Sequence, residues 1–201
     1  MKRGSISALA IALGISVVGL SGCSTMKIAM NPKVPADITT RLPYGVGLYL
    51  TPEFERYHWH GTSKAEGRGL DYDLGSASKA LFLETFLRLA RGAMLVGRKP
   101  PDDNPGEPAA AIVIEPKIVG FGEEHSAFWR IAAYTAHIEY RTVVYDRTGA
   151  VLLDKVYRGD GEARGARTLD PTGNYAAPAD IAMSRAIAAL FRDLSQLPAA
   201  P

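Results

Sequence analysis

The chain has 201 residues, with 23 basic and 21 acidic side chains and a net charge of +2 at pH 7. This near balance argues against nucleic acid as a partner, and the length suits one domain with a sizeable core. Because Cys23 is the only cysteine, no intramolecular disulfide can form, and apolar packing must stabilise the domain.

The first 22 residues have the layout of a secretory signal. Two basic residues at positions 2 and 3 precede an uncharged, mostly apolar stretch from about residue 5 to residue 20. A transmembrane helix is the alternative, but a bilayer span needs roughly 20 apolar residues, and this stretch is shorter and interrupted by glycines. A cleavable signal is therefore the favoured interpretation.

The sequence Leu20-Ser21-Gly22-Cys23 resembles the lipobox of bacterial lipoproteins. The resemblance implies that Cys23 receives a diacylglyceryl thioether, is acylated further (for example by palmitate), and becomes the mature amino terminus. Under a plain secretory signal, the cysteine at the cut would be a coincidence. Ser24, in place of Asp, favours the outer membrane by similarity to enterobacterial sorting, with the domain on the periplasmic face.

Four segments follow from this interpretation. Residues 1–22 are the signal peptide, 23–43 the lipidated cysteine and a tether without periodicity, 44–197 a globular periplasmic domain, and 198–201 a frayed tail. Removing the signal takes away two basic residues and no acid, which leaves 21 of each sign and a formal charge of zero.

Hydrophobic periodicity predicts the elements of the domain in chain order. A strand over 46–50 is followed by a glycine-bearing loop over 61–75 and a helix over 76–91, with Gly92 as its cap. The remaining elements are a strand over 93–96, a loop over 100–108, a strand over 111–121, a strand over 134–145, a hairpin connection at Asp146–Gly149, a strand over 151–158, a loop over 159–178, and a helix over 180–197 that begins at Asp180. Pro116 argues for an edge, a bulge or a break in its strand.

This order, β-α-β-β-β-β-α, predicts a single α/β (α+β) domain. About five strands form one mixed sheet, the two helices pack on it, and the first β-α-β unit is a parallel crossover. In element order alone, the chain resembles the amino-terminal domain of the Tol translocation protein and the lipoproteins that activate penicillin-binding proteins.

The chain also resembles a group of uncharacterised proteobacterial lipoproteins over most of residues 43–162. The residues that carry this resemblance are Val46-Gly47-Leu48-Tyr49, Pro52-Glu53-Phe54, Tyr72-Asp73-Leu74-Gly75, Ala80-Leu81-Phe82 with Phe86, Ile114-Glu115-Pro116, and the Tyr145-Asp146 to Gly149 hairpin. The resemblance implies the fold and an envelope location, and it transfers no catalytic residue.

His58 and His60 are the candidate metal ligands. In an extended segment, residues two apart point to the same side, so both imidazoles could face one ion. Glu123-Glu124-His125 could add ligands if that region lies close. The alternative is a surface aromatic segment, since two histidines alone do not complete a zinc site.

The other candidate sites have simpler explanations. Ser76-Ala77-Ser78-Lys79 matches the Ser-x-x-Lys motif, but its usual partner motifs are missing, so a capped helix start is favoured. His137, Glu139 and Arg141 could form an acid–base group, but they are more typical of the solvent-facing side of a sheet. Asp71 and Asp73 could serve glycoside hydrolysis or bind calcium, but more simply stabilise a helix start.

Two aromatic-rich segments are candidate contact surfaces for a partner. The residues are Tyr57 and Trp59 in the first segment and Phe128 and Trp129 in the second. Local core packing is the equal alternative. If the two segments are exposed and adjacent, they form the preferred contact surface.

The sequence therefore favours a non-catalytic lipoprotein, held in the membrane by Cys23, that serves as an accessory or assembly subunit of an envelope complex. The alternative is a ligand-binding or metal-binding lipoprotein that uses His58 and His60. A serine hydrolase-like enzyme that uses Ser76 and Lys79 comes third. No motif for a cofactor is present.

Overall fold

A computed structural model describes residues 25–63, 67–101, 110–128, 131–166 and 171–197. In chain order the elements are β1 (Met26–Ile28), β2 (Leu42–Leu48), α1 (Pro52–Glu55), β3 (His58–Thr62), β4 (Gly69–Asp73), α2 (Leu74–Leu89), β5 (Ala90–Leu95), β6 (Ile112–Phe128), β7 (Ile131–Asp146), β8 (Val151–Ala166) and α3 (Pro171–Leu194). Cys23 and Trp129 lie outside the described residues.

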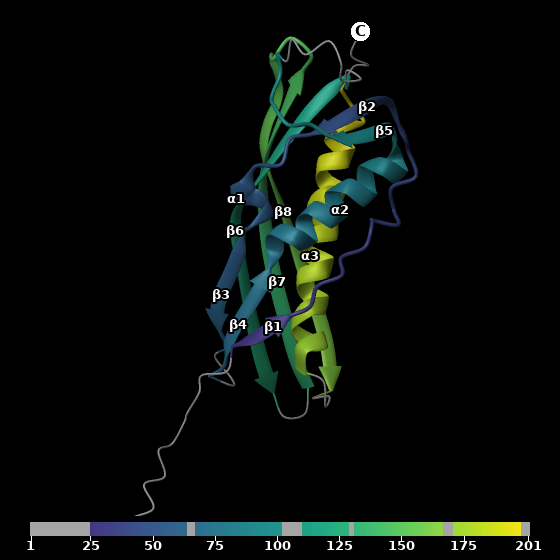
Figure 1. Cartoon of the computed structure of the whole chain (residues 1–201). Helices are drawn as coiled ribbons and strands as arrows, with labels where there is room; N and C mark the ends of the chain where they lie inside the picture. The colour runs from purple at the N-terminus through teal and green to yellow at the C-terminus, as the bar shows by residue number, and fades with distance from the viewer. Residues whose placement is uncertain (1–24, 64–66, 102–109, 129–130, 167–170, 198–201) are drawn as a thin grey trace, which may run out of the picture.

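The chain forms a single mixed α+β domain with two sheets (Figure 1). The larger sheet has the order β5-β2-β6-β7-β8, in which β2 runs parallel to both of its neighbours and the other pairs are antiparallel. These are the five strands that the sequence predicts. The smaller sheet, with the order β1-β4-β3, and the short helix α1 were not predicted.

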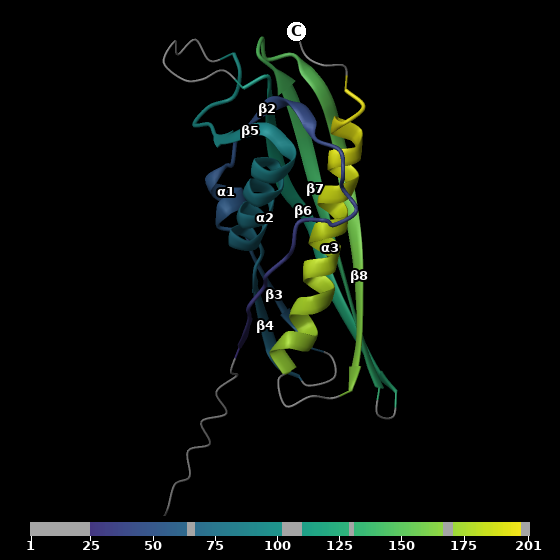
Figure 2. The same cartoon turned by 90° about the vertical axis from the view of Figure 1, so that its right-hand side faces the viewer.

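Strands β6, β7 and β8 form a long ladder on which α3 lies lengthwise (Figures 1 and 2). The close approach of α3 depends on Gly159 and Gly161 in β8. A Cβ atom on Gly159 would overlap the carbonyl oxygen of Ala182, and one on Gly161 would overlap that of Pro178. Only glycine lets two backbones come this close, so these residues fix the helix on the sheet.

The core lies between this sheet and the two long helices. Phe82 and Phe86 of α2 and Phe191 of α3 are almost fully buried, and so is a stripe along α3 that consists of Met183, Ile187, Leu190 and Leu194. A buried polar pair joins Ser78 Oγ of α2 to Tyr140 Oη of β7 at 2.7 Å, and desolvation raises the pKa of the Tyr140 hydroxyl. This pair satisfies two hydroxyls that burial would otherwise penalise.

Pro116 and the hairpin behave as predicted. β6 pairs with β2 over Ile112–Ile114, and the Tyr49 N–H donates to the Ile114 carbonyl at 2.9 Å. Because alternate residues direct their backbone groups to the same side, the Pro116 nitrogen faces a side that β2 has already left. Gly149 lies in the predicted hairpin connection and has a φ of +86°, a conformation that glycine adopts without strain.

Both long helices have boundaries that differ from the prediction. Helix α2 ends at Leu89, and β5 begins at Ala90, so Gly92 is a strand residue rather than a cap. Helix α3 begins at Pro171, and Pro178 lies within it, so Asp180 does not begin the helix. Packing overrides the proline, because Tyr175 and the alanines around Pro178 are buried against β7 and β8.

The expected tether over 24–43 contains structure that the sequence did not reveal. Met26–Ile28 forms β1, which pairs in parallel with β4. The following strap, residues 29–41, lies along α3 (Figure 2). The Asn31 N–H donates to Asp180, and Ser184 Oγ donates to the Lys33 carbonyl at 2.7 Å. A strand of three residues is too short to show a periodic pattern, and bonds between residues about 150 positions apart leave no local pattern. The sequence alone therefore did not predict β1 or the strap.

None of the helices in the described ranges combines the length and the apolar character needed to cross a bilayer.

Candidate functional site

The β3–β4 pair brings four polar side chains onto one face. The two strands are antiparallel, with His58 opposite Asp73 and His60 opposite Asp71. Residues directly opposite one another, and residues two apart on one strand, share a face of a sheet. The histidines therefore do point the same way, as predicted, and the two aspartates join them.

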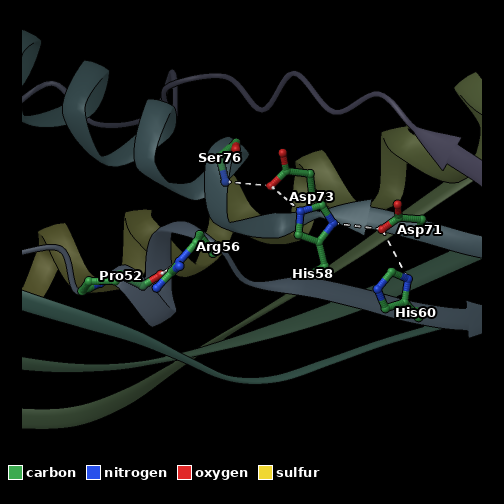
Figure 3. Close-up of polar contacts among 7 residues, drawn as sticks. All are labelled: Pro52, Arg56, His58, His60, Asp71, Asp73 and Ser76. Atoms are coloured by element: carbon green, nitrogen blue, oxygen red, sulfur yellow. Dashed lines mark hydrogen bonds and ion pairs between the residues drawn. The ribbon is translucent and has the colours of Figure 1, made fainter.

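The closest contacts converge on one oxygen atom of Asp71 (Figure 3). His58 Nδ1 lies 3.0 Å from Asp71 Oδ1, and His60 Nδ1 lies 3.4 Å from the same atom. The two imidazole rings stack with their centroids 6.0 Å apart and their planes 15° apart. Two ring nitrogens thus share one carboxylate oxygen.

The cluster is open to solvent on the histidine side. The His60 side chain is 68% exposed and that of His58 43% exposed, whereas that of Asp71 is 15% exposed. The hydrogen bond from His58 is the largest influence on the Asp71 carboxyl and lowers its pKa, although partial burial opposes this shift. Asp71 is therefore an anchored anion beneath two accessible rings.

Asp73 has a structural role as well as its place in the cluster. Its Oδ1 accepts the Ser76 N–H at 3.0 Å and so caps α2, as expected for an acid at a helix start. The same oxygen lies 3.7 Å from His58 Nε2, on the side of the ring opposite Asp71. His58 is thus held between two carboxylates.

Aromatic packing fixes the opposite face of the β3–β4 pair. Trp59 and Tyr72 are opposite one another, and both contact Phe121 of β6, with ring centroids 5.2 Å and 5.0 Å away respectively. The Trp59 ring lies over Gly61, where a side chain would overlap it. The alternation of aromatic and polar residues therefore sets which side chains face solvent.

The other suggested metal ligands do not join this cluster. Glu123, Glu124 and His125 lie on β6, and the His125 ring stacks on Tyr134. Within the described ranges, His58, His60 and Asp71 are the one group of three such ligands whose donor atoms all lie within 4.8 Å of one another. Asp71 was recognised only as part of a carboxylate pair; the period-two pattern of Leu70, Tyr72 and the flanking aspartates was the available signal of a strand.

The Ser76 backbone takes part in the helix cap, and the Lys79 side chain forms an ion pair. Lys79 Nζ donates to Glu55 Oε1 of α1 at 2.6 Å, and the Ser76 N–H bonds to Asp73. The next serine of the motif, Ser78, is buried and bonded to Tyr140. This geometry offers no contact in which Lys79 activates Ser76.

The row of His137, Glu139 and Arg141 lies on the face of the large sheet that faces away from α3. Arg141 binds Asp154 through two bonds of 2.9 Å and 2.7 Å, and Arg158 lies 3.4 Å from Glu139. These are cross-strand ion pairs, the arrangement that the sequence favoured for this row.

Of the four aromatic contact candidates, the structure describes the side chains of Tyr57 and Trp59 only. Tyr57 and Trp59 are partly buried and pack against the core, so local packing accounts for much of their surface. Phe128 is the last residue of β6, and its side chain, like Trp129, lies outside the described part.

One apolar groove lies where the strap meets α3. Its volume is about 350 Å³, and Val34, Pro35, Ile181 and Ala188 line it together with Asp180. Desolvation raises the pKa of Asp180 to about 6, although the Asn31 N–H and Lys33 oppose this shift. The groove lies on α3, whereas the histidines lie on β3.

No family model and no curated protein matches the chain. Among solved structures, a Xanthomonas campestris protein of the family DUF330 aligns with 7% identity and a TM-score of 0.43, over 83% of this chain and 92% of that one. A candidate lipoprotein from Caulobacter crescentus aligns with 18% identity and a TM-score of 0.29, over 45% and 69% of the two chains.

A hypothetical protein from Chlamydia trachomatis aligns with 10% identity and a TM-score of 0.36, over 76% of this chain and 93% of that one. All three TM-scores lie below 0.5, so these likenesses carry no argument about function. They also lend no support to the similarity in element order to the Tol protein or to the activators of penicillin-binding proteins.

Proposed function

We propose that this chain is a lipid-anchored protein of the bacterial envelope, held by Cys23 in the outer membrane, and that its periplasmic domain acts by binding, as a non-catalytic accessory subunit of an envelope complex. The observation that carries the proposal is the sequence Leu20-Ser21-Gly22-Cys23 after a signal-like segment.

The position of β1 supports a close attachment of the domain to the membrane. Met26, the first strand residue, is three residues beyond Cys23, and three extended residues span at most about 10 Å. The anchor would therefore hold the small sheet beside the lipid, because β1 pairs with β4. The ladder β3–β4, with its histidines, would then lie near the membrane surface.

The anchor is tested by lipid labelling and fractionation of the full chain. We expect the wild-type protein to incorporate labelled palmitate and to sediment with outer membranes, because two or three acyl chains on one residue anchor stably. Cys23→Ala should lose the label and the anchor. A Cys23→Ala protein that keeps both would contradict the proposal.

The accessory role is tested separately by photo-crosslinking in intact cells. A photoreactive residue at exposed position 62 of β3 should capture an envelope protein, while one at exposed position 154 of β8 serves as the matched control. If the lipid-anchored protein captures no envelope protein from position 62, or captures the same proteins equally from position 154, the accessory role is wrong while the anchor stands.

A further inference from the structure

We propose that His58, His60 and Asp71 form a binding site for a divalent transition-metal ion of the zinc class, with a fourth position open to water. The inference concerns the folded domain alone and does not depend on the lipid anchor or on a protein partner.

The donor atoms lie at the separations that such an ion requires. Metal–ligand bonds of about 2.0–2.2 Å in a tetrahedral site put neighbouring donors roughly 3.4 Å apart. The distances from Asp71 Oδ1 to the two Nδ1 atoms are 3.0 Å and 3.4 Å, and all three donors lie within 4.8 Å of one another. Since both rings are exposed, small rotations about their side-chain bonds complete the geometry.

The donor types select the class of metal. Two imidazole nitrogens and one carboxylate oxygen suit zinc, copper, nickel and iron, whereas calcium and magnesium take shells made of oxygen. Three protein ligands leave one tetrahedral position unfilled. The exposure of His60 gives water access to this position.

Asp73 is the positioning residue of the site. It lies beside His58 Nε2, the ring nitrogen that faces away from Asp71, at 3.7 Å. Carboxylates in this place orient a ligating imidazole and strengthen it as a ligand. Because Asp73 also caps α2, its own position is fixed by the helix.

The backbone beneath the site is preorganised. The contacts of Trp59 and Tyr72 with Phe121 hold β3 and β4 on β6, so the histidines and Asp71 project from a fixed ladder rather than from a loop. Sites on such elements lose less conformational entropy on binding than sites on loops.

Calorimetry with zinc chloride on the detergent-solubilised, untagged full chain tests the site. We expect one ion per chain. His60→Ala and Asp71→Asn should each weaken binding at least about 100-fold, and Asp73→Asn, which keeps an oxygen for the cap, about 10-fold. His137→Ala, which removes a histidine from β7, is the matched control and should leave affinity unchanged.

Trp59 provides a second readout in a Trp129→Phe background. We expect Cu²⁺ to quench its emission, and His60→Ala to abolish the quenching while the circular dichroism spectrum stays unchanged. The proposal is overturned if zinc gives no heat beyond dilution, if His60→Ala and Asp71→Asn bind zinc as the wild type does, or if calcium binds more tightly than zinc.

Discussion

The two sheets differ in how their exposed charges are matched. On the large sheet, two guanidinium groups have carboxylate partners on the neighbouring strand, Arg141 with Asp154 and Arg158 with Glu139. On the small sheet, two imidazoles converge on a single oxygen of Asp71. The first arrangement satisfies its charges internally, whereas the second gathers electron-pair donors at one point, which is what a cation requires.

Their supports differ as well. The large sheet carries α3 on a backbone-to-backbone contact at Gly159 and Gly161, so its structure tolerates no added atom there. The small sheet is fixed by aromatic packing beneath it and leaves its polar face open. We infer that the large sheet chiefly stabilises the domain and that the small sheet presents its binding side chains.

The largest expected effect is that of Gly159→Ala. Its Cβ would overlap the Ala182 carbonyl oxygen, so helix and sheet must separate, at a cost of about 3 kcal/mol or more in the free energy of unfolding. Gly92→Ala in β5, where an added Cβ has open space, should cost nothing measurable. Urea unfolding measures both, and equal effects would contradict the close contact.

Asp180 should give stability an unusual pH dependence. Because its pKa is raised to about 6 in the folded protein, the folded state holds a proton that the unfolded state has released from about pH 4 upward. Stability therefore falls as pH rises from about 4 to 6, by roughly 1–3 kcal/mol relative to Asp180→Asn. Unfolding curves of both proteins across this range measure the difference.

If the free energies of unfolding of the wild type and Asp180→Asn change with pH in the same way, burial does not raise the pKa of the Asp180 carboxyl. The comparison between the two proteins is needed because Asp71 and Asp193 have lowered pKa values, and their contributions are lost as pH falls.

The buried pair across the core should have an intermediate effect. Tyr140→Phe leaves the Ser78 hydroxyl without its partner, which costs about 1–2 kcal/mol. Adding Ser78→Ala should cost less in this background than in the wild type, because the hydroxyl is already unpaired. A double-mutant cycle by urea unfolding measures this coupling, and strict additivity would mean that the hydrogen bond contributes nothing.

The smallest effect on stability is expected at the small sheet. His60→Ala removes a largely exposed side chain and should change the free energy of unfolding by less than about 0.5 kcal/mol. Thermal unfolding without metal measures it. If His60→Ala destabilises the domain as much as Gly159→Ala does, the division between a stabilising sheet and a binding sheet is wrong.

The predictability of the fold followed the strength of local patterns. Hydrophobic periodicity along the chain identified the five strands of the large sheet and both long helices. The small sheet was not predicted because its strands are short. β1 has three residues, and β3 and β4 have five each and contain glycines, so their alternation cannot be distinguished from a loop. The first turns of α3 were not predicted because a proline such as Pro178 usually ends a helix, whereas here packing against the sheet keeps the helix continuous.

The sequence predicted the two histidines of the site but not the two aspartates, because only the former depends on a local pattern. That His58 and His60 share a face follows from the period of a strand, which is a local property. That Asp71 lies beside them follows from the pairing of β3 with β4, and Asp73 from the start of α2. The sequence suggested Glu123 and Glu124 as additional ligands, and only the pairing of β3 with β4 brings Asp71 to the histidines instead.

Hydrogen–deuterium exchange of the solubilised full chain with and without zinc tests the central claim most directly. We predict slower exchange in β3 (His58–Thr62) and β4 (Gly69–Asp73) on addition of zinc, with β7 and β8 unchanged. Zinc-dependent changes in β7 or β8 without any in β3 and β4, or no change anywhere, would contradict the assignment of binding to the small sheet.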